Sequence, residues 1–203
     1  MNNRVAHILS FLFHPLLIPT YILIILLGFD PTYTVFLPVK MKLLVSGTIL
    51  VTTCIFPLFI IFIMFRMKII TSFYLPKQEE RIFPLITIAI FYYLTFYLMK
   101  DVYLPRNFQI FILGATLLTV VTLLVTLVFR VSIHMTALGA VAGLFFGMTI
   151  LSGGYSLLLL LGAIFVSGLT ASARLKIDAH QPTEIYSGWL IGAVVMCLTS
   201  FFL

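Results

Sequence analysis

Long apolar runs separated by short polar intervals are the main pattern along this chain. The runs cover roughly residues 5–29, 43–65, 82–99, 108–129, 133–150, 156–172 and 184–203. An apolar stretch of about 18 residues or more can cross a bilayer as a helix. The runs do not alternate in the way that membrane β-strands do, so we expect helices. The pattern predicts an all-α, polytopic transmembrane bundle of about seven spans.

Two further features shape these spans. No Asp, Glu, Lys or Arg occurs from Val131 to Ala173, and "SGGY" (152–155) supplies the turn that divides this long run in two. Stripes of glycine at every fourth residue let helix backbones approach closely, which predicts packing and says nothing about chemistry. These stripes are Gly139, Gly143 and Gly147 in the fifth span, and Gly188 and Gly192 in the seventh.

Composition places almost the whole chain in the bilayer. Hydrophobic residues make up 62% of the 203 residues and charged residues 9%, so we expect one integral membrane domain over residues 1–203. The net charge is +6, but the cations sit singly at the ends of apolar runs, and we expect no nucleic-acid partner. Cys54 and Cys197 lie inside apolar runs without motif spacing, as packing residues do. The first run is expected to be a retained span rather than a signal peptide.

Seven spans gather most polar residues on one membrane surface. The intervals after the second, fourth and sixth spans all face the same side, and each leads into the N-terminus of a helix. Unpaired N–H groups and a partial positive charge at such ends suit a phosphate group. The intervals contain Lys77, Glu79, Glu80 and Arg81; then Arg130, Ser132 and His134; then Arg174, Lys176, Asp178, His180 and Glu184.

Two histidines in these intervals could also transform a bound phosphate. A neutral imidazole is a competent nucleophile toward phosphorus, and a second imidazolium can protonate the leaving alkoxide. A nucleophilic histidine needs a carboxylate to fix its tautomer. Glu184 follows His180 by four residues and is the candidate for that role.

Three short segments resemble the signatures of the type-2 phosphatidic acid phosphatase superfamily. "SARLKIDAHQPTE" resembles the third signature, in which Arg, His and Asp are separated by five and three residues; here they are Arg174, His180 and Glu184. "VSIH" is similar to the second signature, Pro-Ser-Gly-His, with Ser132 and His134 in place. "PKQEERIFP" resembles the first, which reads Lys, six residues, Arg-Pro. The resemblance covers about residues 77–200.

The resemblance implies a role for each matching residue. His180 would be the nucleophile that forms a phosphohistidine, Glu184 would orient it, and His134 would be the general acid. The resemblance implies no metal and no cofactor. It implies an α-helical core over about 66–203, with accessory spans over about 1–65 and the site near one membrane surface. The phosphoryl oxygens would be held by Lys77, Arg81, Ser132 and Arg174.

The chain also departs from the family pattern. Glu184 is one methylene longer than the family's aspartate, and Ile133 and Val131 stand where the family has glycine and proline. In the first signature only three residues separate Lys77 from Arg81. These departures leave open a family member that binds phosphate but turns it over slowly.

The expected activity is that of a membrane-embedded lipid phosphatase. Phosphatidic acid, phosphatidylglycerol phosphate and polyprenyl pyrophosphate are the substrate classes that the resemblance suggests, and the sequence does not choose among them. The alternative is a non-catalytic phospholipid-binding or lipid-transport protein that uses the same cations. We expect a bacterial inner-membrane protein whose site faces outward, and the sequence gives no oligomeric state.

Several polar residues have simpler interpretations. Ser132 could act only as a helix N-cap. Arg130 and Lys176 are expected to be anchors at the membrane surface, with a headgroup role left open for Arg130. Asp178 is expected to be a solvated loop charge. His14 lies inside the first span, where an ionisable group suggests function; the simpler expectation is a neutral histidine bonded to a carbonyl that the proline kink frees.

Overall fold

The computed structural model describes residues 2–29, 38–73, 75, 77–102, 104–151, 154 and 156–202. The regular elements in these ranges are helices, and seven segments are long and apolar enough to cross a membrane. The predicted all-α, seven-span architecture is therefore confirmed, and the protein is an integral, multi-pass membrane protein. The seven segments are Asn3–Gly28, Val39–Arg66, Glu79–Met99, Arg106–Thr126, Ile133–Leu151, Leu157–Lys176 and Pro182–Phe202.

The first span is broken once, just before Pro15. It consists of α1 (Asn3–Leu12), a 3₁₀ turn η1 (Pro15–Leu17) and α2 (Ile18–Phe29). His14 is extended, with φ −66° and ψ 134°, because the proline ring disfavours a helical conformation in the residue before it. Pro19 lies in the first turn of α2, where a missing N–H is tolerated. The break in the first span therefore comes from Pro15, and Pro19 is accommodated within α2.

The described chain forms two compact units. Unit 1 comprises Met1–Ile18 and Arg130–Leu203, and unit 2 comprises Pro19–Phe129. The expected division into accessory spans and a phosphatase-like core near residue 66 concerns function, and it stays a prediction.

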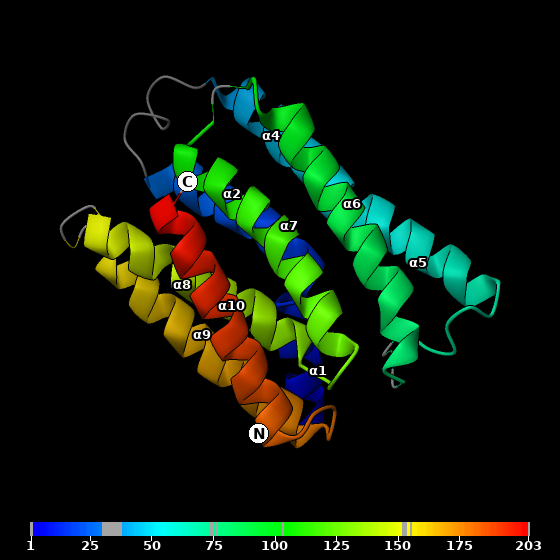
Figure 1. Ribbon diagram of the computed structural model, residues 1–203. Helices are drawn as coiled ribbons and strands as arrows, with labels where there is room; N and C mark the ends of the chain where they lie inside the picture. The colour runs from blue at the N-terminus through cyan, green and yellow to red at the C-terminus, as the bar shows by residue number, and fades with distance from the viewer. Residues whose placement is uncertain are drawn as a thin grey trace. The chain divides into compact units, whose positions relative to one another are not determined.

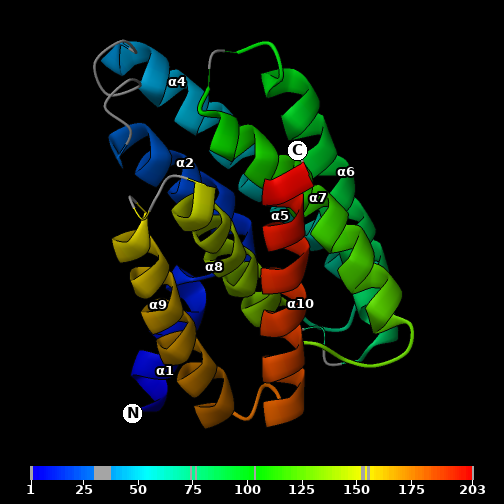
Figure 2. The ribbon, with the colours of Figure 1, turned by 60° about the vertical axis from the view of Figure 1, so that its left-hand side comes forward.

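Unit 1 is built around a close pair of helices. Helix α8 (Ile133–Leu151) packs against α9 (Leu157–Lys176) and α10 (Pro182–Phe202), and α1 packs against α9 (Figures 1 and 2). The N-termini of α8 and α10 meet, because the Ser132 N–H donates to the carbonyl of Glu184 at 3.0 Å. Helices α8 and α10 therefore run parallel from a common end.

The glycine stripes lie at the contact between α8 and α10. A Cβ added to Gly139 would overlap the carbonyl oxygen of Trp189, and one added to Gly192 would overlap that of Thr136. The backbones touch because the glycine at each contact has no side chain to hold the helices apart. The prediction that the stripes serve packing is confirmed.

The outer face of α10 is apolar. Tyr186, Leu190, Val194, Leu198 and Phe202 recur every four residues, and all five are exposed. Small residues on the packed face and large apolar residues on the outer face are what a helix in lipid requires.

Unit 2 contains the remaining spans. Helix α6 packs against α7, α5 and η2, a turn of π-helix between α4 and α5. Some of the buried hydroxyls of unit 2 bond one another, and the Thr95 hydroxyl, for example, lies 2.8 Å from that of Thr52. The buried hydroxyls of Thr20 and Thr126 have no hydrogen-bond partner among the described residues. Besides α2 from Pro19 onward, the elements of unit 2 are α4 (Val39–Leu50), η2 (Val51–Ile55), α5 (Phe56–Arg66), η3 (Glu79–Arg81), α6 (Ile82–Met99) and α7 (Arg106–Thr126).

Candidate active site

A capped helix end places His180. The Ala179 N–H donates to the Arg174 carbonyl and the Asp178 N–H to the Leu175 carbonyl, both at 3.1 Å. Asp178 has a left-handed φ of 50°. This bonding pattern is a Schellman motif, which ends α9 and turns the chain. Asp178 is exposed, as expected of a loop charge, and it also supplies the left-handed residue that the motif needs.

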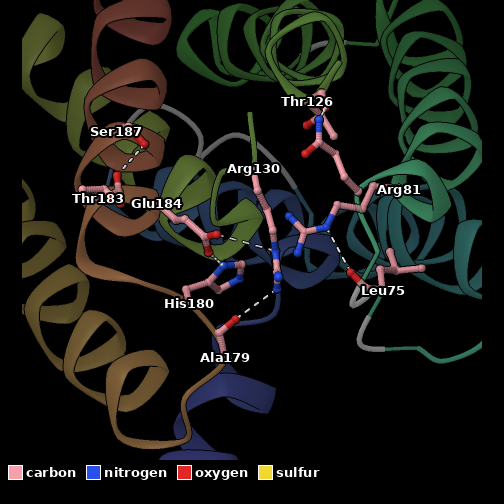
Figure 3. A network of polar contacts seen from close by, with 10 residues as sticks. Leu75, Arg81, Thr126, Arg130, Ala179, His180, Thr183, Glu184 and Ser187 are labelled. Carbon is pink, nitrogen blue, oxygen red and sulfur yellow. Dashed lines mark hydrogen bonds and ion pairs between the residues drawn. The ribbon is translucent and has the colours of Figure 1, made fainter. Parts of the chain in front are cut away.

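His180 is held by a carboxylate. Its Nδ1 lies 2.5 Å from Oε2 of Glu184, which stands in the first turn of α10 (Figure 3). An ionised carboxylate only accepts hydrogen bonds, so Nδ1 carries the proton, and the lone pair of the neutral ring is on Nε2. The His180 side chain is 3% exposed. This buried pair has the tautomer that a nucleophilic imidazole requires.

Residues 130–132 contact the turn that carries His180 and the start of α10. Arg130 Nη2 donates to the Ala179 carbonyl at 3.2 Å, and its Nε lies 3.8 Å from Oε1 of Glu184 (Figure 3). The Ser132 N–H bonds the Glu184 carbonyl, as described above. Two segments almost 50 residues apart in sequence are thus joined by side-chain and main-chain contacts. Arg130 is therefore a structural partner of Glu184, beyond the surface anchor that the sequence predicts.

His134, in the first turn of α8, is held by the N-terminal segment. Its Nε2 lies 3.1 Å from the carbonyl oxygen of Ser10, in the last turn of α1. A carbonyl only accepts, so Nε2 of His134 carries a proton. The ring of His14 stands edge-on to that of His134, with centroids 5.3 Å apart and an interplanar angle of 84°.

Electrostatic interactions link these histidines with Arg174. The side chains of Arg174, His14 and His180 all lie within electrostatic range of the His134 imidazole. Arg174 is 7% exposed although it is close to the C-terminal end of α9. A buried guanidinium beside imidazoles is a favourable environment for an anion.

Unpartnered hydroxyls occur in the same unit. Ser132 is fully buried, and its Oγ has no hydrogen-bond partner among the described residues. The same is true of the buried hydroxyls of Ser10 and Thr170. Leaving a hydroxyl buried and unpaired costs about 1–3 kcal/mol, which a bound acceptor would offset.

The two remaining predicted site residues belong to unit 2. Arg81 is 2% exposed, and its Nε donates to the Leu75 carbonyl at 3.1 Å (Figure 3). Lys77 is exposed in the loop that leads to η3. The phosphate-binding roles of Lys77, Arg81, Ser132 and Arg174 all stay predictions. The predicted site residues that lie in unit 1 are Ser132, His134, Arg174, His180 and Glu184.

Two of the simpler interpretations are wrong. The Ser132 hydroxyl does not cap α8; instead its carbonyl starts the helix by accepting from the Thr136 N–H at 2.9 Å. Among the described residues, no carbonyl bonds the His14 ring; its Nδ1 instead accepts from the Leu16 N–H at 3.4 Å. The histidine that bonds a carbonyl at the proline break is His134.

Sequence reasoning missed two components of this site. The Ser10 carbonyl belongs to the main chain, so the type of residue at position 10 does not indicate it. A helix that ends before Pro15 must nevertheless leave carbonyls in its last turn without a helical partner. Arg130 carried a signal, since it stands two residues before Ser132 at the start of α8.

Comparisons with protein-family models, curated proteins and solved structures give no match. Over the ranges that the structure describes, no three His, Cys, Asp or Glu side chains gather as a metal site would require.

Proposed function

We propose that the protein is a membrane-embedded lipid phosphatase of the type-2 phosphatidic acid phosphatase kind. It would hydrolyse a phosphomonoester or pyrophosphate of a lipid through a phosphohistidine. The observation that carries the proposal is the pair of His180 and Glu184. A buried histidine whose Nδ1 is held by a carboxylate presents Nε2 as a nucleophile, and a protein that only binds phosphate has no need of this arrangement.

In the first step, Nε2 of His180 attacks phosphorus and the bond from phosphorus to the lipid oxygen breaks. His134 gives a proton to the leaving oxygen, and Glu184 stabilises the charge that develops on His180. In the second step, water attacks the phosphohistidine, His134 takes a proton from that water, and inorganic phosphate leaves. Arg174 and the Ser132 hydroxyl would hold the phosphoryl oxygens, with Arg81 and Lys77 as further predicted ligands.

The substrate is a phosphate or pyrophosphate on a lipid whose tail stays in the bilayer. Phosphatidic acid, phosphatidylglycerol phosphate and polyprenyl pyrophosphate fit this description equally well. We place the protein in a bacterial inner membrane with the site facing outward and the C-terminus inside. A reporter fused to the C-terminus tests this orientation, and a reporter signal from the outer side would reverse it.

The test of function is phosphate release. The full chain is purified in detergent and given a panel of lipid phosphates with a chelator present. We expect release by the wild type, and loss of at least about 10³-fold in kcat for His180→Ala, because the nucleophile is removed. His7→Ala is the matched control, since His7 is exposed on α1.

The alternative function is non-catalytic binding of phospholipid. It predicts no release from any member of the panel, together with lipid-phosphate binding that weakens in Arg174→Gln. That pair of results would replace the phosphatase proposal.

A further inference from the structure

We infer that the N-terminal segment is part of the active site, and that His14 and the carbonyl of Ser10 position His134. The inference deepens the proposed function and rests on His134 being the general acid. It assigns a role to a span that the sequence places among the accessory ones. His14 is a positioning residue here, since it acts through His134.

The Ser10 contact follows from how α1 ends. The residue before Pro15 cannot continue the helix, so the last turn of α1 has carbonyls without a following helical N–H. The His14 N–H bonds the Phe11 carbonyl at 3.2 Å instead of the one four residues back, which is that of Ser10. The Nε2–H of His134 donates a hydrogen bond to that carbonyl, with Nε2 3.1 Å from the oxygen. The break thus creates the acceptor that holds the Nε2 proton of His134.

His14 supplies the second contact. Its Nδ1 accepts from the Leu16 N–H, so Nδ1 carries no proton and the ring is neutral. That bond fixes the ring where it meets His134 edge-on, with centroids 5.3 Å apart. A neutral His14 adds no second cation to the Arg174 guanidinium, which already lies within electrostatic range of His134.

Together the two contacts define how His134 works. The proton on Nε2 is committed to the Ser10 carbonyl, so His134 acts as the general acid in its imidazolium form, and the proton that moves to the leaving group comes from Nδ1. The His14 ring restricts rotation of the imidazole about that bond. A general acid held in this way stays aligned with a leaving oxygen, and small misplacements of such groups cost large factors in rate.

The first test compares two substrates with different leaving groups, in order to distinguish a role of His14 in positioning the general acid from a role in binding substrate. A lipid phosphate has a poor alkoxide leaving group that needs the acid, whereas p-nitrophenyl phosphate has a good one that needs it little. We expect His14→Asn to lower kcat about 10-fold on the lipid phosphate, with KM within about 2-fold, and to affect the aryl ester much less. His7→Asn, on the exposed face of α1, is the matched control.

Two variants distinguish the ring contact of His14 with His134 from the hydrogen bond that His14 accepts from the Leu16 N–H. Asparagine can still accept from the Leu16 N–H but lacks the ring, whereas His14→Phe keeps a ring and lacks the acceptor. Higher activity in His14→Phe than in His14→Asn supports positioning by the ring. Full activity in His14→Asn, or equal losses on both substrates, would overturn the inference.

The second test does not depend on activity. The chain has only four histidines, so ¹⁵N-histidine NMR of the full chain in detergent can be assigned by single substitutions. We expect the His134 ring resonances to move in His14→Asn and to stay in place in His7→Asn. If the wild type releases no phosphate, the proposed function fails, and this spectrum still decides the His14 contact; unmoved His134 resonances would refute it.

Discussion

Arg130 and Glu184 lie 3.8 Å apart, measured from Nε to Oε1, while the other oxygen of the same carboxylate bonds His180. One acidic group therefore serves a cation on the segment before α8 and an imidazole on the turn before α10. The side chains of Arg130 and Glu184 are 33% and 16% exposed, so water partly screens their attraction.

We expect the ion pair itself to contribute less than about 1 kcal/mol to stability. The measurement is a double-mutant cycle of Arg130→Gln and Glu184→Gln, followed by unfolding in detergent. Arg66→Gln, at an exposed position, is the control for loss of a cation. A coupling well above about 2 kcal/mol would show that the pair behaves as a buried one.

Glu184→Gln should lower kcat for phosphate release by a factor on the order of 10²–10⁴, because an amide cannot stabilise the charged form of His180. KM should change little, since the residues proposed to bind the phosphoryl oxygens remain. Glu184→Asp keeps the carboxylate but shortens the reach to Nδ1, so we expect an intermediate kcat. An unchanged kcat in Glu184→Gln would contradict the assigned role.

Ser132→Ala should separate stability from binding. The variant removes a fully buried hydroxyl without a partner among the described residues, so the free energy of unfolding should stay the same or rise by up to about 1 kcal/mol. Affinity for inorganic phosphate, measured by protection against thermal unfolding, should fall. Ser172→Ala on the exposed side of α9 is the control. A destabilised variant with unaltered phosphate affinity would refute this interpretation.

Gly192→Ala should destabilise the protein by about 1–3 kcal/mol, because the new methyl group would meet the Thr136 carbonyl and push α8 and α10 apart. Gly162→Ala is the matched control, since a Cβ on this α9 glycine meets nothing within 4 Å. We expect that variant to be within about 1 kcal/mol of the wild type, as alanine favours the helix. Similar losses in both variants would contradict backbone contact at Gly192.

Asp178→Gly should stabilise the turn before His180 by about 1 kcal/mol, because glycine adopts a left-handed φ without the cost that other residues have. Asp178→Val should destabilise it, since a β-branched side chain resists that conformation. Thermal unfolding of the two variants gives the comparison. Equal stability of the two would show that the turn can adopt another conformation.

The spans could be predicted because lipid imposes a local rule. Each transmembrane helix must be long and apolar by itself, so its residues can be found without knowledge of its neighbours. The glycine stripes could be predicted for the same reason, because their spacing along one helix defines a face. The pair of His180 and Glu184 is also local, since one helical turn separates the two residues.

The remaining contacts of the site could not be predicted in this way. The bond from His134 to Ser10 joins residues 124 positions apart and uses a main-chain carbonyl. Every residue has such a carbonyl, so the sequence does not indicate which one is used. The bond from Arg130 to Ala179 is of the same kind. Such pairs depend on which helices pack together, and hydrophobic pattern alone does not determine that.

The close contact of α8 with α10 has a mechanical consequence. Bilayers differ in thickness, and a span adapts to its bilayer largely by tilting. Two helices whose backbones are in contact must tilt as one rigid body. The imidazoles at their shared end then move together and keep their spacing. The spacing of the reactive groups should therefore be the same in thin and thick membranes, so turnover should follow the headgroup of the lipid more closely than the length of its chains.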